Sequence, residues 1–249
     1  MNVEVCLFLI GHRNDTHRER RDIDLSLIHA ASQNVEGLRR FVIHRPVESA
    51  KPAQSAQSAN SDPPSTEHAL SPCCVLQWYF DDLDRVETVL QRGGAIHGIV
   101  DQTINAAHDH LAFEQQLMAV RKFAIPNVHE SSNQSEKCTY LVGYEGEAQD
   151  FDAWLTHYMT HHPPLMAQLP GIRELEIYTR VDYRTGLNIP RAVAMQRNKV
   201  VFDDPAALAA ALASPVRALM KKDFDAFPPY SGPASHFPMR SIYGNLKWT

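Results

Sequence analysis

The sequence predicts an α+β fold made of two ferredoxin-like βαββαβ repeats whose sheets face each other and close into one barrel. Three observations lead to this prediction. The order strand, helix, strand, strand, helix, strand can be followed twice along the 249 residues, and both halves contain a similar glycine-led strand and a similar aspartate-capped helix. A four-stranded sheet with helices on one face leaves its other face bare, so two such sheets can cover each other. Eight strands are enough to close a barrel.

The internal repeat is clearest in two short segments. Residues 37–43 (GLRRFVI) and 171–177 (GIRELEI) share the glycine, an arginine and the spacing of apolar positions. Residues 80–82 and 202–204 both read FDD, and each triplet precedes a helical pattern. Because the two agreements follow each other in the same order, each strengthens the other.

The first half is expected to span residues 1–126. A continuous apolar run predicts a strand at 3–10, and alternation predicts another at 38–47. Residues 48–72 are rich in Ala, Ser, Gln and Pro, so we expect a long flexible loop there. The other elements expected in this half are a helix capped by Asp22 or Asp24, strands at 75–80 and 117–125, a helix capped by Asp81 or Asp82, and a helix at about 99–110.

The second half, residues 138–249, follows a polar linker at 127–137 and repeats the order of elements. Asp150 can cap a helix at 150–161. A second helix is expected from Pro205 to about Phe224, with Leu208, Leu212, Val216 and Leu219 along one side. The strands expected here lie at 140–144, 172–181, 192–202 and 237–243.

Composition argues against several classes of function. A net charge of −5 and a pI near 6.2 give no basic surface for nucleic acid. No apolar run approaches the roughly 18 residues of a membrane span, and residues 1–10 lack the basic start of a signal peptide. Four scattered cysteines do not form a disulfide framework in a chain this long. We therefore expect a cytoplasmic protein with neither a nucleic acid nor a membrane as partner.

Residues 154–172 carry the pattern of a known family. Its three parts are WLTH at 154–157, HPPL at 162–165 and LPGI at 169–172. This pattern resembles the signature of the EthD-like family, and the resemblance covers most of residues 138–245 but only short parts of the first half. It implies a dimeric α/β-barrel fold made here from two fused copies, with a possible homodimer of fused barrels. The family includes isomerases, decarboxylases and dehydratase or cyclase enzymes of aromatic catabolism and polyketide pathways.

The strand at 172–181 is expected to supply ligand-binding residues. Side chains alternate between the two faces of a strand, so Glu174, Glu176, Tyr178 and Arg180 should point into the barrel. The repeat places Arg40, Val42 and His44 at matching interior positions. A barrel of this size holds side chains or one small ligand. The alternative to ligand binding is that these polar residues only line a water-filled interior.

His162 is the candidate catalytic residue. The residue before a proline avoids the helical region, so we expect His162 at a break in the helix, with its imidazole projecting from the chain. Its titration near neutrality suits proton transfer. The alternative is a purely structural cap at the break. In the first half His29 matches only with a one-residue gap, which predicts a single site in the second half.

Trp154, His157, Tyr158 and His161 share the same predicted helix. His157 and His161 lie four residues apart and could bind a metal, but no third ligand is near in sequence. We expect one of the two to support His162 and Trp154 with Tyr158 to contact the substrate. Some fused ferredoxin-like barrels bind haem through a helical histidine, but no second feature indicates haem here. The chain also lacks a glycine-rich phosphate loop, so no cofactor is expected.

The leading hypothesis is therefore a cofactor-independent acid/base enzyme of lyase or isomerase type, acting on a small aromatic or lactone-like acid. His162 would transfer the proton, supported by His161 or His157. Tyr178 and Arg180 would orient the substrate, with Arg180 on its carboxylate. The alternative is a non-catalytic small-molecule-binding or stress-response protein on the same fold.

Overall fold

The strands of the protein form one closed antiparallel barrel. A computed structural model describes residues 3–13, 23–47, 71–104, 111–126 and 136–244. The strands are β1 (Val5–Arg13), β2 (Leu38–Pro46), β3 (Cys74–Phe80), β4 (Leu111–Lys122), β5 (Glu136–Tyr144), β6 (Glu174–Arg180), β7 (Gln196–Phe202) and β8 (Ala234–Tyr243), in the barrel order β1-β3-β2-β8-β5-β7-β6-β4. The predicted α+β class and the eight-stranded barrel are therefore confirmed.

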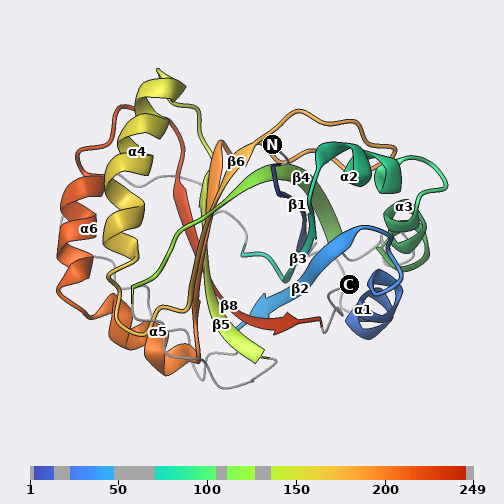
Figure 1. Ribbon diagram of the computed structural model, residues 1–249, viewed down its shortest axis with the longest axis horizontal. Helices are drawn as coiled ribbons and strands as arrows, with labels where there is room; N and C mark the ends of the chain where they lie inside the picture. The colour runs from blue at the N-terminus through green and yellow to red at the C-terminus, as the bar shows by residue number, and fades with distance from the viewer. Residues whose placement is uncertain (1–2, 14–22, 48–70, 105–110, 127–135, 245–249) are drawn as a thin grey trace.

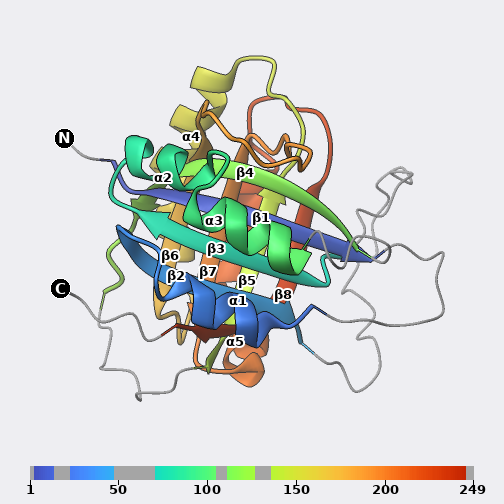
Figure 2. The ribbon, with the colours of Figure 1, turned by 90° about the vertical axis from the view of Figure 1, so that its right-hand side faces the viewer.

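The helices cover the outside of the barrel in two groups, one on each side (Figure 1). The helices of the first half are α1 (Leu25–Ser32), α2 (Leu83–Leu90), α3 (Ala95–Ile99) and the π-helix η1 (Val100–Ile104). Those of the second half are α4 (Phe151–Met166), α5 (Pro205–Leu212) and α6 (Val216–Phe224). Seen from the side of the first group, α1 to α3 lie across the outer face of β1 to β3 (Figure 2).

The apolar core has three parts because the barrel has an outer and an inner face. One cluster lies between the first-half sheet and its helices, with Trp78 at its centre, and a second lies under α4, around Trp154 and Tyr158. A third, including Phe8 and Tyr178, fills the barrel interior. Apolar burial on both faces of each sheet therefore holds the two halves together.

Both halves have the same strand order when numbered within each half. The neighbours run β4-β1-β3-β2 in the first half and β8-β5-β7-β6 in the second. The two sheets are joined where β2 pairs with β8 and where β4 pairs with β6. Neither sheet is therefore left with an unpaired edge strand, which would otherwise be open to association with another chain.

Aspartate caps begin the helices as the sequence predicts. Side-chain oxygens of Asp24, Asp82, Asp150 and Asp204 each accept a hydrogen bond from a backbone N–H in the first turn. These bonds satisfy backbone donors that a helix start would leave free.

Three predicted helical features are wrong. The helix expected at 205–224 is divided into α5 and α6 near Pro215, and Leu219 is exposed. The helix expected at 99–110 begins earlier, at Ala95, and its residues 105–110 lie outside the described residues. Most of the predicted loop and linker (residues 48–70 and 127–135) also lie outside the described residues.

The expected break at His162 is the third error. Helix α4 runs without interruption to Met166 through Pro163 and Pro164. A proline removes one helical hydrogen bond, but the buried face formed by Trp154, Tyr158 and His162 packs against the sheet and keeps the helix in place. His162 therefore lies along a helix surface instead of projecting from a break.

Candidate functional site

Alternate residues of β6 point to opposite sides of the barrel wall. Leu175 and Ile177 belong to the outer core under α4, whereas Tyr178 belongs to the interior cluster. Glu176 is fully buried inside with it. The alternation therefore assigns Glu176 and Tyr178 to the interior correctly, whereas Arg180, also expected inside, is exposed at the end of the strand.

One end of the interior holds a charged cluster. It consists of two cations, two carboxylates and three phenols: Arg40, Lys199, Glu174, Glu176, Tyr79, Tyr178 and Tyr243. Lys199 Nζ lies 2.8 Å from a carboxylate oxygen of Glu176 and 2.9 Å from one of Glu174. Arg40 forms ion pairs with the same two glutamates. The opposite charges are equal in number, so the cluster is electrically balanced.

The phenols of the charged cluster donate to its carboxylates. Tyr178 OH lies 2.5 Å and Tyr79 OH 2.9 Å from Oε2 of Glu176, and the two hydroxyls are 2.7 Å apart. Burial, together with the nearby charge of Glu176, raises the pKa of both phenols well above the ordinary value. Burial acts to raise the pKa of Glu176 as well, but Lys199 and Arg40 hold it well below its usual range. The cluster therefore contains neutral phenols beside an ionised carboxylate.

His44 extends this network across the barrel. Its Nε2 is 2.6 Å from Oε1 of Gln77, and its Nδ1 is 2.6 Å from Oγ of Ser241. Gln77 in turn donates to Tyr178 OH at 3.2 Å. An amide oxygen only accepts, so the proton of the imidazole resides on Nε2. Burial lowers the pKa of His44 to about 3, so His44 is neutral near pH 7 and acts as a hydrogen-bonding group.

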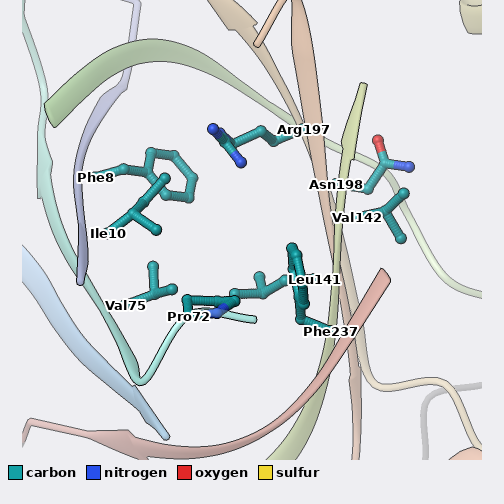
Figure 3. Close-up of a pocket in the computed structure, with 9 residues that line it drawn as sticks. All are labelled: Phe8, Ile10, Pro72, Val75, Leu141, Val142, Arg197, Asn198 and Phe237. Carbon is teal, nitrogen blue, oxygen red and sulfur yellow. The ribbon is translucent and has the colours of Figure 1, made fainter. Parts of the chain in front are cut away.

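An apolar pocket lies beside the charged cluster, inside the same barrel (Figure 3). About 310 Å³ of space not filled by atoms lies within it, part of which is open to solvent, and it is lined by Phe8, Ile10, Pro72, Val75, Leu141, Val142, Arg197, Asn198 and Phe237. The Phe8 ring packs edge-on against Tyr178, with centroids 4.9 Å apart. Phe8 therefore separates the pocket from the hydroxyl groups of the charged cluster.

Among the residues that the structure describes, Arg197 is the only charged one that lines the pocket. Its side chain points from β7 towards Phe8 and the middle of the barrel (Figure 3). Tyr178 is its direct neighbour on β6. Burial lowers the pKa of Arg197, while Glu145 and Glu114 oppose this shift.

The histidines of α4 lie outside the barrel. His162 Nδ1 is 2.8 Å from one carboxylate oxygen of Asp223 on α6, and His157 Nε2 is 3.2 Å from the other. His162 is 5% exposed, and burial lowers its pKa although Asp223 acts in the opposite direction. His161 is exposed next to His157. None of these residues lines the pocket, so the catalytic role of His162 and His161 stays a prediction.

The remaining predicted site residues are divided between the two sides of the wall. Trp154 and Tyr158 stack on each other in the outer core, 5.1 Å between centroids. The Arg180 guanidinium lies at an exposed position 5.5 Å from the centroid of Phe151, at the start of α4. Of the predicted substrate-binding set, only His44, Glu176 and Tyr178 share the barrel interior.

Sequence reasoning missed the two basic residues of β7. Arg197 and Lys199 alternate with the buried residues Gln196, Asn198 and Val200 in a segment predicted to be a strand, and both face inwards. Basic residues at every second position of a buried strand were the signal that could have identified them.

A metal site is not apparent in the described part of the chain. No group of three or more His, Cys, Asp or Glu side chains there is arranged to hold a metal ion. The nine residues that line the pocket include no histidine, cysteine or carboxylate. None of the described helices combines the length and apolar character that a membrane crossing requires.

The closed antiparallel barrel with helices outside it is a fold that other solved structures share. An anthrone oxidase-like protein matches 98% of this chain and 94% of its own, with a TM-score of 0.61 and 11% identity. A candidate monooxygenase from Fusobacterium nucleatum matches 99% and 94%, with a TM-score of 0.51 and 8% identity. At these identities the likeness concerns the fold alone.

An EthD family protein from Bacillus halodurans matches 40% of this chain and 95% of its own, with 20% identity and a TM-score of 0.33. A score this low carries no argument about family membership. No protein-family model matches the sequence. No curated protein matches it either.

Proposed function

We propose that the barrel interior is the active site of a cofactor-independent acid/base enzyme acting on a small aromatic or lactone-like acid. The reaction class would be isomerisation, dehydration, cyclisation or decarboxylation. The observation that carries this proposal is the position of an apolar pocket with one cation next to a phenol–carboxylate–ammonium cluster. Concave apolar pockets with a few polar groups are where proteins usually bind small molecules.

Tyr178 is the proton donor in this proposal. It lies directly beside Arg197, and its hydroxyl contacts Glu176 and Tyr79. A phenol with a raised pKa stays protonated near neutral pH, so it can give a proton to, or share one with, an enolate that develops when the ionised carboxylate of Glu176 takes the proton released by the substrate carbon. Lys199, 3.0 Å from Tyr79 OH, stabilises the negative charge left on the phenols. The Phe8 ring must turn aside for a substrate to reach the hydroxyl.

The His162–Asp223 pair is the second location for acid/base chemistry. A carboxylate that accepts from one ring nitrogen orients the other nitrogen for proton transfer. Asp223 lies in this relation to His162, with His157 on its other oxygen. This site would act on a ligand bound against α4 and α6, on the outer side of the barrel wall.

Enolisation of phenylpyruvate, an aromatic carbon acid, distinguishes the two locations. We expect Tyr178→Phe to lower proton exchange at its benzylic carbon in D₂O by about 10²-fold or more, because general acid–base groups contribute about 10²–10⁴-fold. His162→Ala should leave the rate within a factor of two. NMR of the substrate measures both rates. The opposite result, a loss with His162→Ala alone, would move the active site to α4.

A non-catalytic binding protein is the second candidate function. It is favoured by the separation of the pocket from the hydroxyls by Phe8, and by the engagement of the phenols with the carboxylates. If phenylpyruvate and other aromatic acids bind without any turnover or proton exchange, even in a Phe8→Ala variant that joins pocket and cluster, the binding function is correct.

We also propose that the chain arose by fusion of two ferredoxin-like repeats, residues 1–126 and 138–249. The shared strand order supports this proposal. So do Gly37 and Gly171, which precede β2 and β6 with φ of 75° and 74°. A conformation with positive φ favours glycine, so the same backbone requirement occurs at the same place in both halves. Pairing of two such barrels into a homodimer, and a cytoplasmic location, stay predictions.

A further inference from the structure

Arg197 differs from the other interior arginine. Arg40, in the charged cluster, forms ion pairs with two glutamates. Arg197 has no carboxylate within ion-pairing distance among the described residues; its side-chain hydrogen bond runs from Nε to Oε1 of Gln116, at 3.1 Å. The rest of the guanidinium faces the apolar pocket, 5.9 Å from the centroid of Phe8.

The surroundings hold this guanidinium in place. Gln116 accepts from Arg197 and also donates to the backbone carbonyl of Ala194 at 2.7 Å, so its amide is fixed at both ends. A β-carbon on Gly143 would lie only 3.0 Å from a terminal nitrogen of Arg197. The glycine therefore leaves the space that the guanidinium occupies. A cation that is partly removed from water without an ion pair is costly, and such groups are usually paired.

We propose that Arg197 binds the anionic group of the pocket's ligand, and that this ligand is a single-ring aromatic monocarboxylate. The inference rests on the proposed function of the barrel interior and names its substrate class. A planar guanidinium offers two parallel N–H groups to one carboxylate. One cation matches one negative charge, and apolar walls that include Phe8, Leu141 and Phe237 match a ring. The pocket is small, which favours a ligand with a single ring over a larger one.

This anchor also sets the orientation of the ligand. With its carboxylate on Arg197, the ring lies against Phe8, and the atoms next to the carboxylate face Tyr178, the direct neighbour of Arg197. The charged cluster would then act on the carbon closest to the carboxylate.

The test compares benzoate with its neutral amide, benzamide, in NMR titrations of the full chain. The wild type is expected to bind benzoate at least tenfold more tightly than benzamide. Arg197→Met should lose this preference and keep its affinity for benzamide.

Arg121→Met is the matched control and should keep the preference. Arg121 is an exposed arginine of a barrel strand, and it donates a hydrogen bond to Thr179. Gly143→Ala, which shifts the guanidinium by a few tenths of an ångström but keeps its charge, should weaken benzoate binding and leave benzamide binding unchanged.

The outcomes separate the two proposals. Equal affinities for benzoate and benzamide in the wild type, or a preference that survives Arg197→Met, would overturn the anchor while leaving the pocket as a binding site. A preference lost with Arg180→Met instead would assign the anchor to Arg180 and also overturn this inference. No binding of either compound at millimolar concentration would overturn the barrel pocket and the anchor together. Thermal melting of each variant shows that it is folded, so that none of these losses reflects unfolding.

Discussion

Replacing Lys199 by methionine is expected to lower the free energy of unfolding by about 3–5 kcal/mol. Lys199 is fully buried and contacts Glu174, Glu176 and the hydroxyl of Tyr79. Without its ammonium group, two carboxylates share the single cation of Arg40. A buried charge that loses its partner is costly because water cannot solvate it.

Urea denaturation of the wild type and the variant measures this change. Lys221→Met is the matched control: Lys221 also pairs with a carboxylate, that of Asp225, but both side chains are exposed. Ion pairs of this kind contribute little to stability, so the control should unfold near the wild-type midpoint. If both variants lost stability equally, the interior would be open to water and the charged cluster would not be buried.

The second large effect is a dependence of the free energy of unfolding on pH that arises from His44. Burial lowers the pKa of His44 to about 3 in the folded chain, against an ordinary value of 6.5. The charges of Lys199 and Arg40 act in the same direction, while Gln77 and Glu176 oppose it. Below pH 6.5 the unfolded chain therefore binds a proton at His44 that the folded chain does not bind. His44 does not lower the free energy of unfolding above pH 7, and it lowers it progressively as the pH falls towards 3.

Between pH 7 and pH 5 this loss amounts to about 2 kcal/mol. His44→Gln removes the titrating group and can keep hydrogen bonds to Ser241 and Gln77, so its free energy of unfolding should change less over this range, by about that amount. Denaturation of both proteins at each pH measures the difference. Equal slopes for the two proteins would mean that His44 is accessible to water in the folded state.

The sequence predicted the interior positions of Glu176 and Tyr178 on β6 correctly, but it did not predict the helical conformation at His162. Glu176 and Tyr178 were assigned to the interior because a strand exposes alternate residues to alternate faces. His162 was expected at a break because prolines follow it, but packing of α4 on the sheet outweighed the proline effect. Arg180 is two residues after Tyr178 and should point to the same face of β6, but it lies beyond the buried part of the strand.

Arg197 and Lys199 could not be interpreted from local pattern alone. Their significance depends on which strands stand beside and across from β7. Lys199 meets Tyr79 of the first half only because the barrel closes, and Arg197 faces a pocket whose walls come from both halves. These neighbours are far apart in the sequence, so no spacing rule brings them together.

The sequence by itself determined the local features of this protein: the strands and the inward face of β6, the starts of helices at four aspartates, and the repeated order of elements. These follow from backbone geometry and the period of apolar residues, which act over a few residues. Only the tertiary structure decided which charges are paired and which arginine faces a pocket. These features depend on distances between segments far apart in the chain, and closure of the barrel fixes those distances.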